Sequence, residues 1–220
     1  TPPWLIYLRI VVFASAPAYM RPSVKDKGYA GALKKTGLPT PSDDLEREPL
    51  YMQAVPGYAR RAREAFGGNF QLVMKSVEDA RSQGLLVDLF IISPRYGIIT
   101  ERDQVLPYSS SLTGKPKKHL RDFSAKHRVK ELINDLLKDP CDLLAVVVNR
   151  SELVLLHDPE QGFDIRGLGA RVAVFSAPSA KKQFGGKVEY HPARQVRTRS
   201  AHFSKYMDDL TKRTLKEFAA

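Results

Sequence analysis

Four short apolar runs restrict the fold of this chain more than any other feature of its sequence. They are rich in Val, Ile and Leu, and each gives way to a small polar residue or a proline. The runs are Leu5–Ala14, Leu85–Ile92, Asp142–Val148 and Arg171–Ser176. Continuous apolar runs of this length are typical of strands that are buried on both faces of a parallel sheet. The sequence therefore predicts a central sheet with helices on both faces.

Helical patterns separate these runs and follow the last of them. The predicted helices are Tyr58–Phe66, Phe70–Gln83, His119–Leu137 and Ser200–Phe218, and Glu152–His157 fits a short strand or helix. This alternation predicts an α/β three-layer sandwich with a mostly parallel central sheet. We expect one α/β domain over residues 1–220, with a long irregular insertion at about 18–50 that could form an ordered lid.

The numbers and positions of the cysteine and histidine residues argue against a disulfide and against a metal site. The single cysteine, Cys141, excludes an internal disulfide and a cysteine-based zinc site, and it fits a reducing, cytoplasmic compartment. The five histidines lack the spacing of metal ligands, and no glycine-rich phosphate loop occurs, so we expect no metal and no cofactor. The apolar stretch Leu5–Ala18 is interrupted by Arg9 and is shorter than the roughly 20 residues that cross a bilayer, so we expect no membrane association.

The positive charge of the chain is concentrated in two windows. The formal net charge is +11, and the windows Lys115–Lys130 and Lys181–Lys205 each carry +6, so the remainder is close to neutral. Clustered cations of this kind favour binding to the phosphates of a nucleic acid, DNA or RNA. The candidate phosphate-binding residues are Lys117, Lys118, Arg121, Arg194, Arg197 and Arg199. The alternative is a solvated basic surface with no specific partner.

Small polar residues follow the predicted strands where the chain leaves the sheet. Ser15, Ser93 and Asn149 occupy three of these positions. In open α/β sheets, ligands bind in the crevice beyond the carboxyl ends of the strands, so these side chains are candidates for a nucleobase or ligand pocket. Taken singly, such residues more often cap a helix or a turn than bind a ligand.

One loop carries a family resemblance. It reads Ile92-Ser93-Pro94-Arg95-Tyr96-Gly97-Ile98-Ile99, then Asp103, then Val105-Leu106-Pro107-Tyr108 and Leu112, and Glu48-Pro49-Leu50-Tyr51 precedes it. This block resembles the S-x-x-Y-G-L … D … I-x-P-Y-x-x-x-L block of the uncharacterised DUF6884-type family and is similar to that of the YaaA peroxide-stress proteins. The resemblance implies a fold like that of YaaA or of uracil-DNA glycosylase, and an association with DNA. It transfers no catalytic residue, and the Ala-Pro-Ala-Tyr that follows Ser15 departs from the lysine-rich turn of those families.

The same loop suggests physical roles for its side chains. Tyr51, Tyr96 and Tyr108 can stack on a base, with Arg95 on the backbone, because base stacking on an aromatic ring contributes roughly 1 to 3 kcal/mol. The alternative is that these tyrosines pack the loop against the sheet. Asp103 is the candidate catalytic residue, as a general base or a water-positioning group.

Three hypotheses for function follow, and the sequence leaves open whether the protein is an enzyme. The first is a nucleic-acid-binding protein that acts in modification, repair or stress response. The second is a nucleobase- or nucleotide-processing enzyme of the glycosidase type, with a small-molecule pocket at the carboxyl ends of the strands. The third is a protein whose basic surface binds an acidic protein partner. The oligomeric state is also left open.

Overall fold

The computed structural model describes residues 8–186 and 188–219. Residues 5–7 of the first predicted strand and Lys187 of the second basic window lie outside the described residues. The central sheet has six strands in the order β4-β3-β1-β6-β7-β8, and all pairs except β3 with β4 are parallel. The strands are β1 (Arg9–Ser15), β3 (Leu86–Ser93), β4 (Gly97–Thr100), β6 (Leu143–Val147), β7 (Arg171–Ser176) and β8 (Glu189–Pro192). The predicted α/β fold with a mostly parallel sheet is confirmed.

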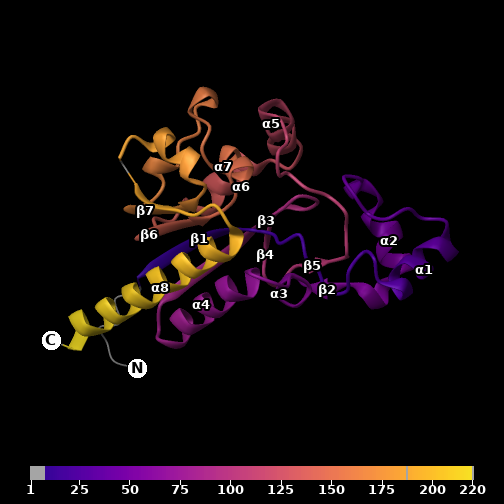
Figure 1. Cartoon of the computed structure of the whole chain (residues 1–220), viewed down its shortest axis with the longest axis horizontal. Coiled ribbons are helices and arrows are strands. Elements are labelled where there is room, and N and C mark those ends of the chain that lie inside the picture. Colours follow the sequence, from indigo (N-terminus) through magenta and orange to yellow (C-terminus); the bar gives the residue numbers. More distant parts are fainter. Residues whose placement is uncertain (1–7, 187, 220) are drawn as a thin grey trace.

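Helices cover the sheet on both faces, which gives three layers (Figure 1). On one face α4 (Phe70–Ser82) and α8 (Val196–Ala219) pack side by side against alternate side chains of the strands. On the other face lie α5 (Lys117–Lys126), α6 (Val129–Leu136) and α7 (Arg150–Leu156), with three 3₁₀ helices. The 3₁₀ helices are η3 (Pro159–Gln161), η4 (Ile165–Gly167) and η5 (Pro178–Phe184). Because both faces are covered, the central strands are apolar without alternation, which is the pattern that predicted them.

The order of the strands places a topological switch point beside β1. The chain passes from β1 to β3 on one side and later to β6 on the other, so the connections leave β1 and β6 in opposite directions. A crevice forms at the carboxyl ends of two such strands, because their connections diverge. Here Ser15 ends β1 and Asn149 lies just beyond β6, and we refer to the region between these two strand ends as the crevice.

Two predicted helices differ in the structure. The segment Tyr58–Phe66 forms η2 (Pro56–Tyr58), the strand β2 (Arg60–Arg61) and a single turn, α3 (Ala62–Ala65). Its helical pattern is overridden because β2 pairs antiparallel with β5 (Gln104–Val105). The predicted helix His119–Leu137 is split into α5 and α6 by Arg128, whose φ of 51° is left-handed and cannot continue a helix.

Helices occupy part of the insertion that the sequence predicted to be irregular. They are α1 (Lys27–Thr36), η1 (Leu45–Arg47) and α2 (Glu48–Ala54). Asp26 caps α1 by accepting hydrogen bonds from two backbone amides, and Gly37 ends it with a φ of 72°. Tyr29, Leu33 and Tyr51 form a small apolar cluster of their own beside the sheet. In the described part of the chain, no helix combines the length and the apolarity that a membrane span requires.

Candidate functional site

Three polar residues form a closed hydrogen-bonded group at the switch point. The Asn149 side chain caps α7 and accepts a hydrogen bond from the Glu152 amide at 2.9 Å. The Asn149 amide donates to Ser15 Oγ at 3.1 Å, and Ser15 Oγ donates to the Glu152 carboxyl group. The structure therefore brings two predicted pocket residues, Ser15 and Asn149, onto a carboxyl group that the sequence analysis missed.

Glu152 has the electrostatics of an acid–base group. Its exposed fraction is 2%, and it forms no ion pair within 4 Å in the part of the chain that the structure describes. Burial raises its pKa from the ordinary 4.5 to about 7, although the hydrogen bonds of Ser15 and Asn149 and the charge of Arg199 lower it. A carboxyl group that titrates near neutral pH can both donate and accept a proton under physiological conditions.

Arg199 lies near Glu152, on the opposite layer of the sandwich. It is 4% exposed, and its Nε has no hydrogen-bond partner among the described residues. Burial lowers its pKa, and the charge of Glu152 partly offsets this effect. Ser176 Oγ, at the carboxyl end of β7, is fully buried and likewise lacks a described partner. An acid, a cation and a buried hydroxyl group thus lie at the carboxyl ends of the strands.

The position of Arg199 corrects the sequence analysis, which placed it on the basic surface. Helix α8 begins at Val196, so Arg199 lies one turn inside it and shares a face with the fully buried Phe203. That face packs against the sheet, and the guanidinium group of Arg199 is therefore buried. Arg194 and Arg197 are exposed, as predicted for a basic surface.

Arg95 is held in a structural clamp. It is 1% exposed and forms ion pairs with Asp44 at 2.7 Å and Glu48 at 2.6 Å. Burial alone would lower its pKa, but its hydrogen bonds to the two carboxylates raise it instead. The guanidinium group lies over the rings of Tyr51 and Tyr96, with its carbon 5.4 and 5.5 Å from their centroids. These contacts join the insertion to the end of β3.

The clamp corrects the prediction of an open stacking platform. Tyr51 is fully buried and donates a hydrogen bond to Asp44 at 2.6 Å, and Tyr96 donates one to Glu48 at 2.7 Å. Their rings contact Arg95 on one side, so they pack the loop, as the alternative interpretation held. Tyr108 is packed in the same way: its ring contacts the Tyr96 ring edge to face, with 5.7 Å between the ring centroids.

Ser93 and Tyr108 lie on the crevice side of the clamp. Ser93 Oγ donates to Tyr108 Oη at 3.1 Å, and both side chains are buried. Burial raises the pKa of Tyr108, and the charge of Glu152 contributes to this shift. Of the predicted pocket residues, Ser15, Ser93, Tyr108 and Asn149 therefore gather around Glu152, whereas Tyr51, Arg95 and Tyr96 belong to the clamp.

Asp103 does not enter the crevice. It is exposed and accepts hydrogen bonds from the backbone amide and the hydroxyl group of Thr100, at 2.7 and 3.0 Å. Strand β4 runs antiparallel to β3, so the chain beyond Thr100 leads away from the carboxyl ends of the parallel strands. The structure therefore places this predicted catalytic carboxylate in an exposed turn that it stabilises, apart from the residues around Glu152.

Acidic partners neutralise the predicted residues of the first basic window. Lys117 pairs with Glu160 at 2.7 Å, Arg121 pairs with Asp158 and Glu160 at 2.7 Å each, and Lys118 pairs with Asp122 at 2.8 Å. Two of these partners lie about forty residues further along the chain, so local charge counting could not identify them. The exposed cations of the second window, Lys181, Lys182, Arg194 and Arg197, form no ion pair within 4 Å in the described ranges.

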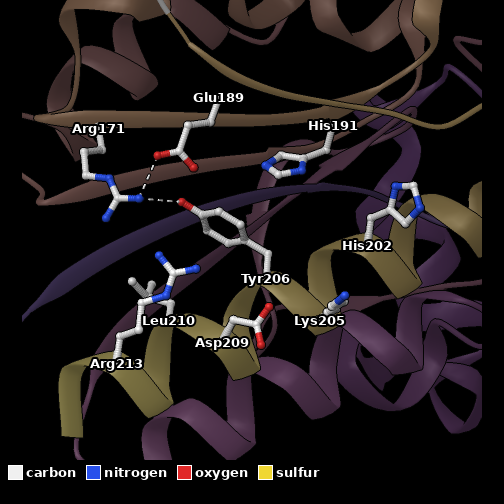
Figure 2. A pocket seen from close by; sticks show the side chains of 9 residues that line it. All are labelled: Arg171, Glu189, His191, His202, Lys205, Tyr206, Asp209, Leu210 and Arg213. Carbon is white, nitrogen blue, oxygen red and sulfur yellow. Dashed lines mark hydrogen bonds and ion pairs between the residues drawn. The ribbon is translucent and has the colours of Figure 1, made fainter. Parts of the chain in front are cut away.

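A hollow lies at the amino ends of β7 and β8, away from the crevice. It has a volume of about 590 Å³, and the side chains that line it come from those strands and from α8 (Figure 2). Arg171 donates to Glu189 at 2.7 Å and to Tyr206 at 3.2 Å, so the charge of this arginine is already paired. His191 is stacked on Phe175 with 4.5 Å between ring centroids. Its Nε2 atom is buried and has no hydrogen-bond partner among the described residues.

Local sequence signals account for Glu152 in retrospect. Asn149-Arg150-Ser151-Glu152 has the pattern of a capping box, directly after a buried strand, and it places the carboxyl group in the first turn of a helix at the strand end.

Among the described residues, no group of three or more His, Cys, Asp or Glu side chains is arranged to hold a metal ion. No protein-family model matches the chain, and neither does any curated protein.

Proposed function

We propose that this protein is a nucleotide-processing enzyme of the glycosidase type, which hydrolyses the bond between a base and its sugar. One observation carries the proposal: a buried carboxyl group, Glu152, with a pKa of about 7 lies at the topological switch point of the sheet. Perturbed carboxyl groups in such crevices are typical of general acids and bases. Ser15 and Asn149 orient Glu152, so that little reorganisation is needed when a substrate arrives.

The proposed reaction uses Glu152 first as an acid and then as a base. The bond between C1′ and the base nitrogen breaks, its electron pair leaves with the base, and the Glu152 carboxyl group gives its proton to that base. Water then adds its hydroxyl group to C1′ and returns its proton to the Glu152 carboxylate. The products are the free base and the sugar with a hydroxyl group at C1′, and the enzyme is regenerated.

Base release tests this function. The protein would be incubated with the common nucleosides, their 5′-monophosphates and single-stranded DNA and RNA, and free base would be measured by chromatography. We expect Glu152→Gln to lower the rate by at least about 100-fold, because positioned acid–base groups contribute that much or more. Asp103→Asn is the matched control and should retain the rate, because Asp103 lies in an exposed turn. Release that is equal in Glu152→Gln, or absent from every substrate, would contradict the proposal.

Nucleic-acid binding is the second candidate function, and the exposed cations of the second window favour it. Arg194 and Arg197 lie just before and within the first turn of α8, at the same edge as the crevice, and Lys181 and Lys182 lie on η5. A strand bound there could present a base to Glu152. Because cations on phosphates release counterions, the affinity should fall steeply between about 50 and 200 mM salt.

Fluorescence anisotropy of labelled DNA and tRNA separates the two windows. We expect Arg194→Glu with Arg197→Glu to weaken binding strongly. The control, Lys117→Glu with Lys118→Glu, should weaken it less, because these lysines already pair with carboxylates. Absence of binding to any probe at low salt would refute nucleic-acid binding and leave a free nucleotide as the substrate.

A further inference from the structure

We infer that the crevice binds the terminal phosphate of a mononucleotide, held by the buried guanidinium group of Arg199 at the open amino end of α8. The inference rests on the proposed function and narrows its substrate class to 5′-mononucleotides. Arg95 and Arg199 are both buried, but only Arg95 is paired with carboxylates. These are the two arginines that rank among the buried polar residues described by the structure, at 1% and 4% exposure.

Arg95 and Arg199 differ completely in their partners. Arg95 has two carboxylates within 2.7 Å, whereas Arg199 forms no ion pair within 4 Å and its Nε donates no hydrogen bond in the described part of the chain. A buried cation without a partner is strongly destabilising, and buried charges in proteins are normally paired with an opposite charge. Arg199 therefore behaves as half of an ion pair whose other half comes from outside the chain.

The amino end of α8 adds further donors at the same place. The first hydrogen bond of this helix runs from the Arg199 amide to the Gln195 carbonyl, and among the described residues no hydrogen bond uses the amides of residues 196–198. Free amides at the start of a long helix attract anions, and phosphate groups are among the anions that such sites bind. Helical side chains lean toward the amino end of their helix, which directs Arg199 toward the strand ends. Figure 1 shows α8 beginning near the end of β1 and running beneath the sheet.

The surroundings of Arg199 favour a terminal phosphate over an internal one. A buried guanidinium group can be reached only by the end of a ligand, because a phosphate within a nucleic-acid strand carries a sugar on both sides. A phosphate monoester offers several oxygens to the planar fork of an arginine. Ser176 Oγ is buried beside the Tyr190 hydroxyl group, and the charge of Arg199 acts on the same tyrosine, so a further hydroxyl group lies in this region. Exposed Arg194 and Arg197 flank the approach with the same sign of charge.

Glu152 lies at a suitable position for the opposite end of such a ligand. The two charged groups act on each other electrostatically but form no ion pair, so Arg199 and Glu152 are more than 4 Å apart. The phosphate would occupy the Arg199 end, and the base would lie toward Glu152, Ser15 and Tyr108. Arg199 is thus a binding residue for the substrate, and Glu152 remains the acid–base group.

Isothermal titration calorimetry at constant ionic strength tests the inference. The probes are inorganic phosphate, adenosine 5′-monophosphate, adenosine and the dinucleotide ApA, whose phosphate is internal. We expect phosphate and the monophosphate to bind, adenosine and ApA to bind at least tenfold more weakly, and Arg199→Met to weaken both phosphate-bearing probes at least tenfold. Arg121→Met, which removes an arginine already paired with Asp158, should leave both affinities unchanged.

The variants also remain informative without a ligand. Removing an unpaired buried charge should raise the melting temperature of the free protein in Arg199→Met, which a merely structural arginine would not do. If that variant does not fold, Arg199→Lys keeps the charge without the fork and should bind phosphate more weakly than the wild type. Phosphate affinity that is the same in wild type and Arg199 variants, or absent in the wild type, would overturn the inference. Phosphate binding without base release would instead overturn the proposed enzyme and leave the phosphate site in place.

Discussion

Replacing Glu152 with Gln should change how the stability of the protein depends on pH. The folded state raises the pKa of this carboxyl group from 4.5 to about 7, so the folded protein holds the proton more tightly than the unfolded chain does. This contribution to stability is fully present below pH 4.5 and is lost as the pH rises to about 7. Gln cannot ionise, so the variant lacks this loss.

The magnitude follows from proton linkage. Each pH unit between the unfolded and folded pKa values corresponds to about 1.4 kcal/mol, so the wild type should lose about 3 kcal/mol relative to Glu152→Gln between pH 4.5 and pH 8. Because Glu152 is only 2% exposed, solvent screens this effect weakly. Part of the loss will be offset if the ionised carboxylate draws closer to Arg199.

Urea denaturation of both proteins at a series of pH values measures this difference. The free energy of unfolding of the variant minus that of the wild type should rise with pH and level off above about pH 8. The difference removes the contribution of all other titrating groups that the two proteins share. A difference that stays constant from pH 4.5 to pH 8, or that falls, would refute the argument that Glu152 is buried and protonated at the switch point.

Two further predictions concern the clamp and the loop after β3. Arg95→Met should lower the free energy of unfolding by roughly 3 to 5 kcal/mol in urea denaturation, because it leaves two carboxylates without their cation. Arg63→Met, which breaks an exposed pair, should cost about 1 kcal/mol or less, and equal effects would contradict the clamp. Gly97→Ala should cost roughly 1 to 3 kcal/mol, since φ is 78° and the new Cβ would lie 2.9 Å from His127 Cβ. Gly31→Ala, with open space around its Cβ, should not destabilise the protein in the same assay.

The fold was largely predictable because its main determinant is local. Apolar runs mark strands such as β6 and β7 directly, since a strand covered on both faces needs an apolar side chain at nearly every position. The elements that were missed depend on distant contacts. Strand β4 has only four residues and exists through its pairing with β3, and the break at Arg128 has no glycine or proline to announce it.

The candidate site was predictable only in part. Ser15 and Asn149 were identified because their position after a strand is a property of the local sequence. Glu152 was not identified, and Arg199 was predicted only as part of a basic surface. Burial decides the chemistry of both residues, and burial depends on how α7 and α8 pack on opposite faces of the sheet. The same limit applies to Arg95, whose acidic partners lie about fifty residues earlier in the chain.

The pH dependence of base release from a 5′-monophosphate tests the central claim most directly. If the Glu152 carboxyl group protonates the leaving base, the rate should be constant at low pH and fall tenfold per unit well above a midpoint near pH 7, and Glu152→Gln should abolish this decline together with most of the activity. A rate that is independent of pH across this range in the wild type, or the same decline in Glu152→Gln, would show that another group performs the chemistry.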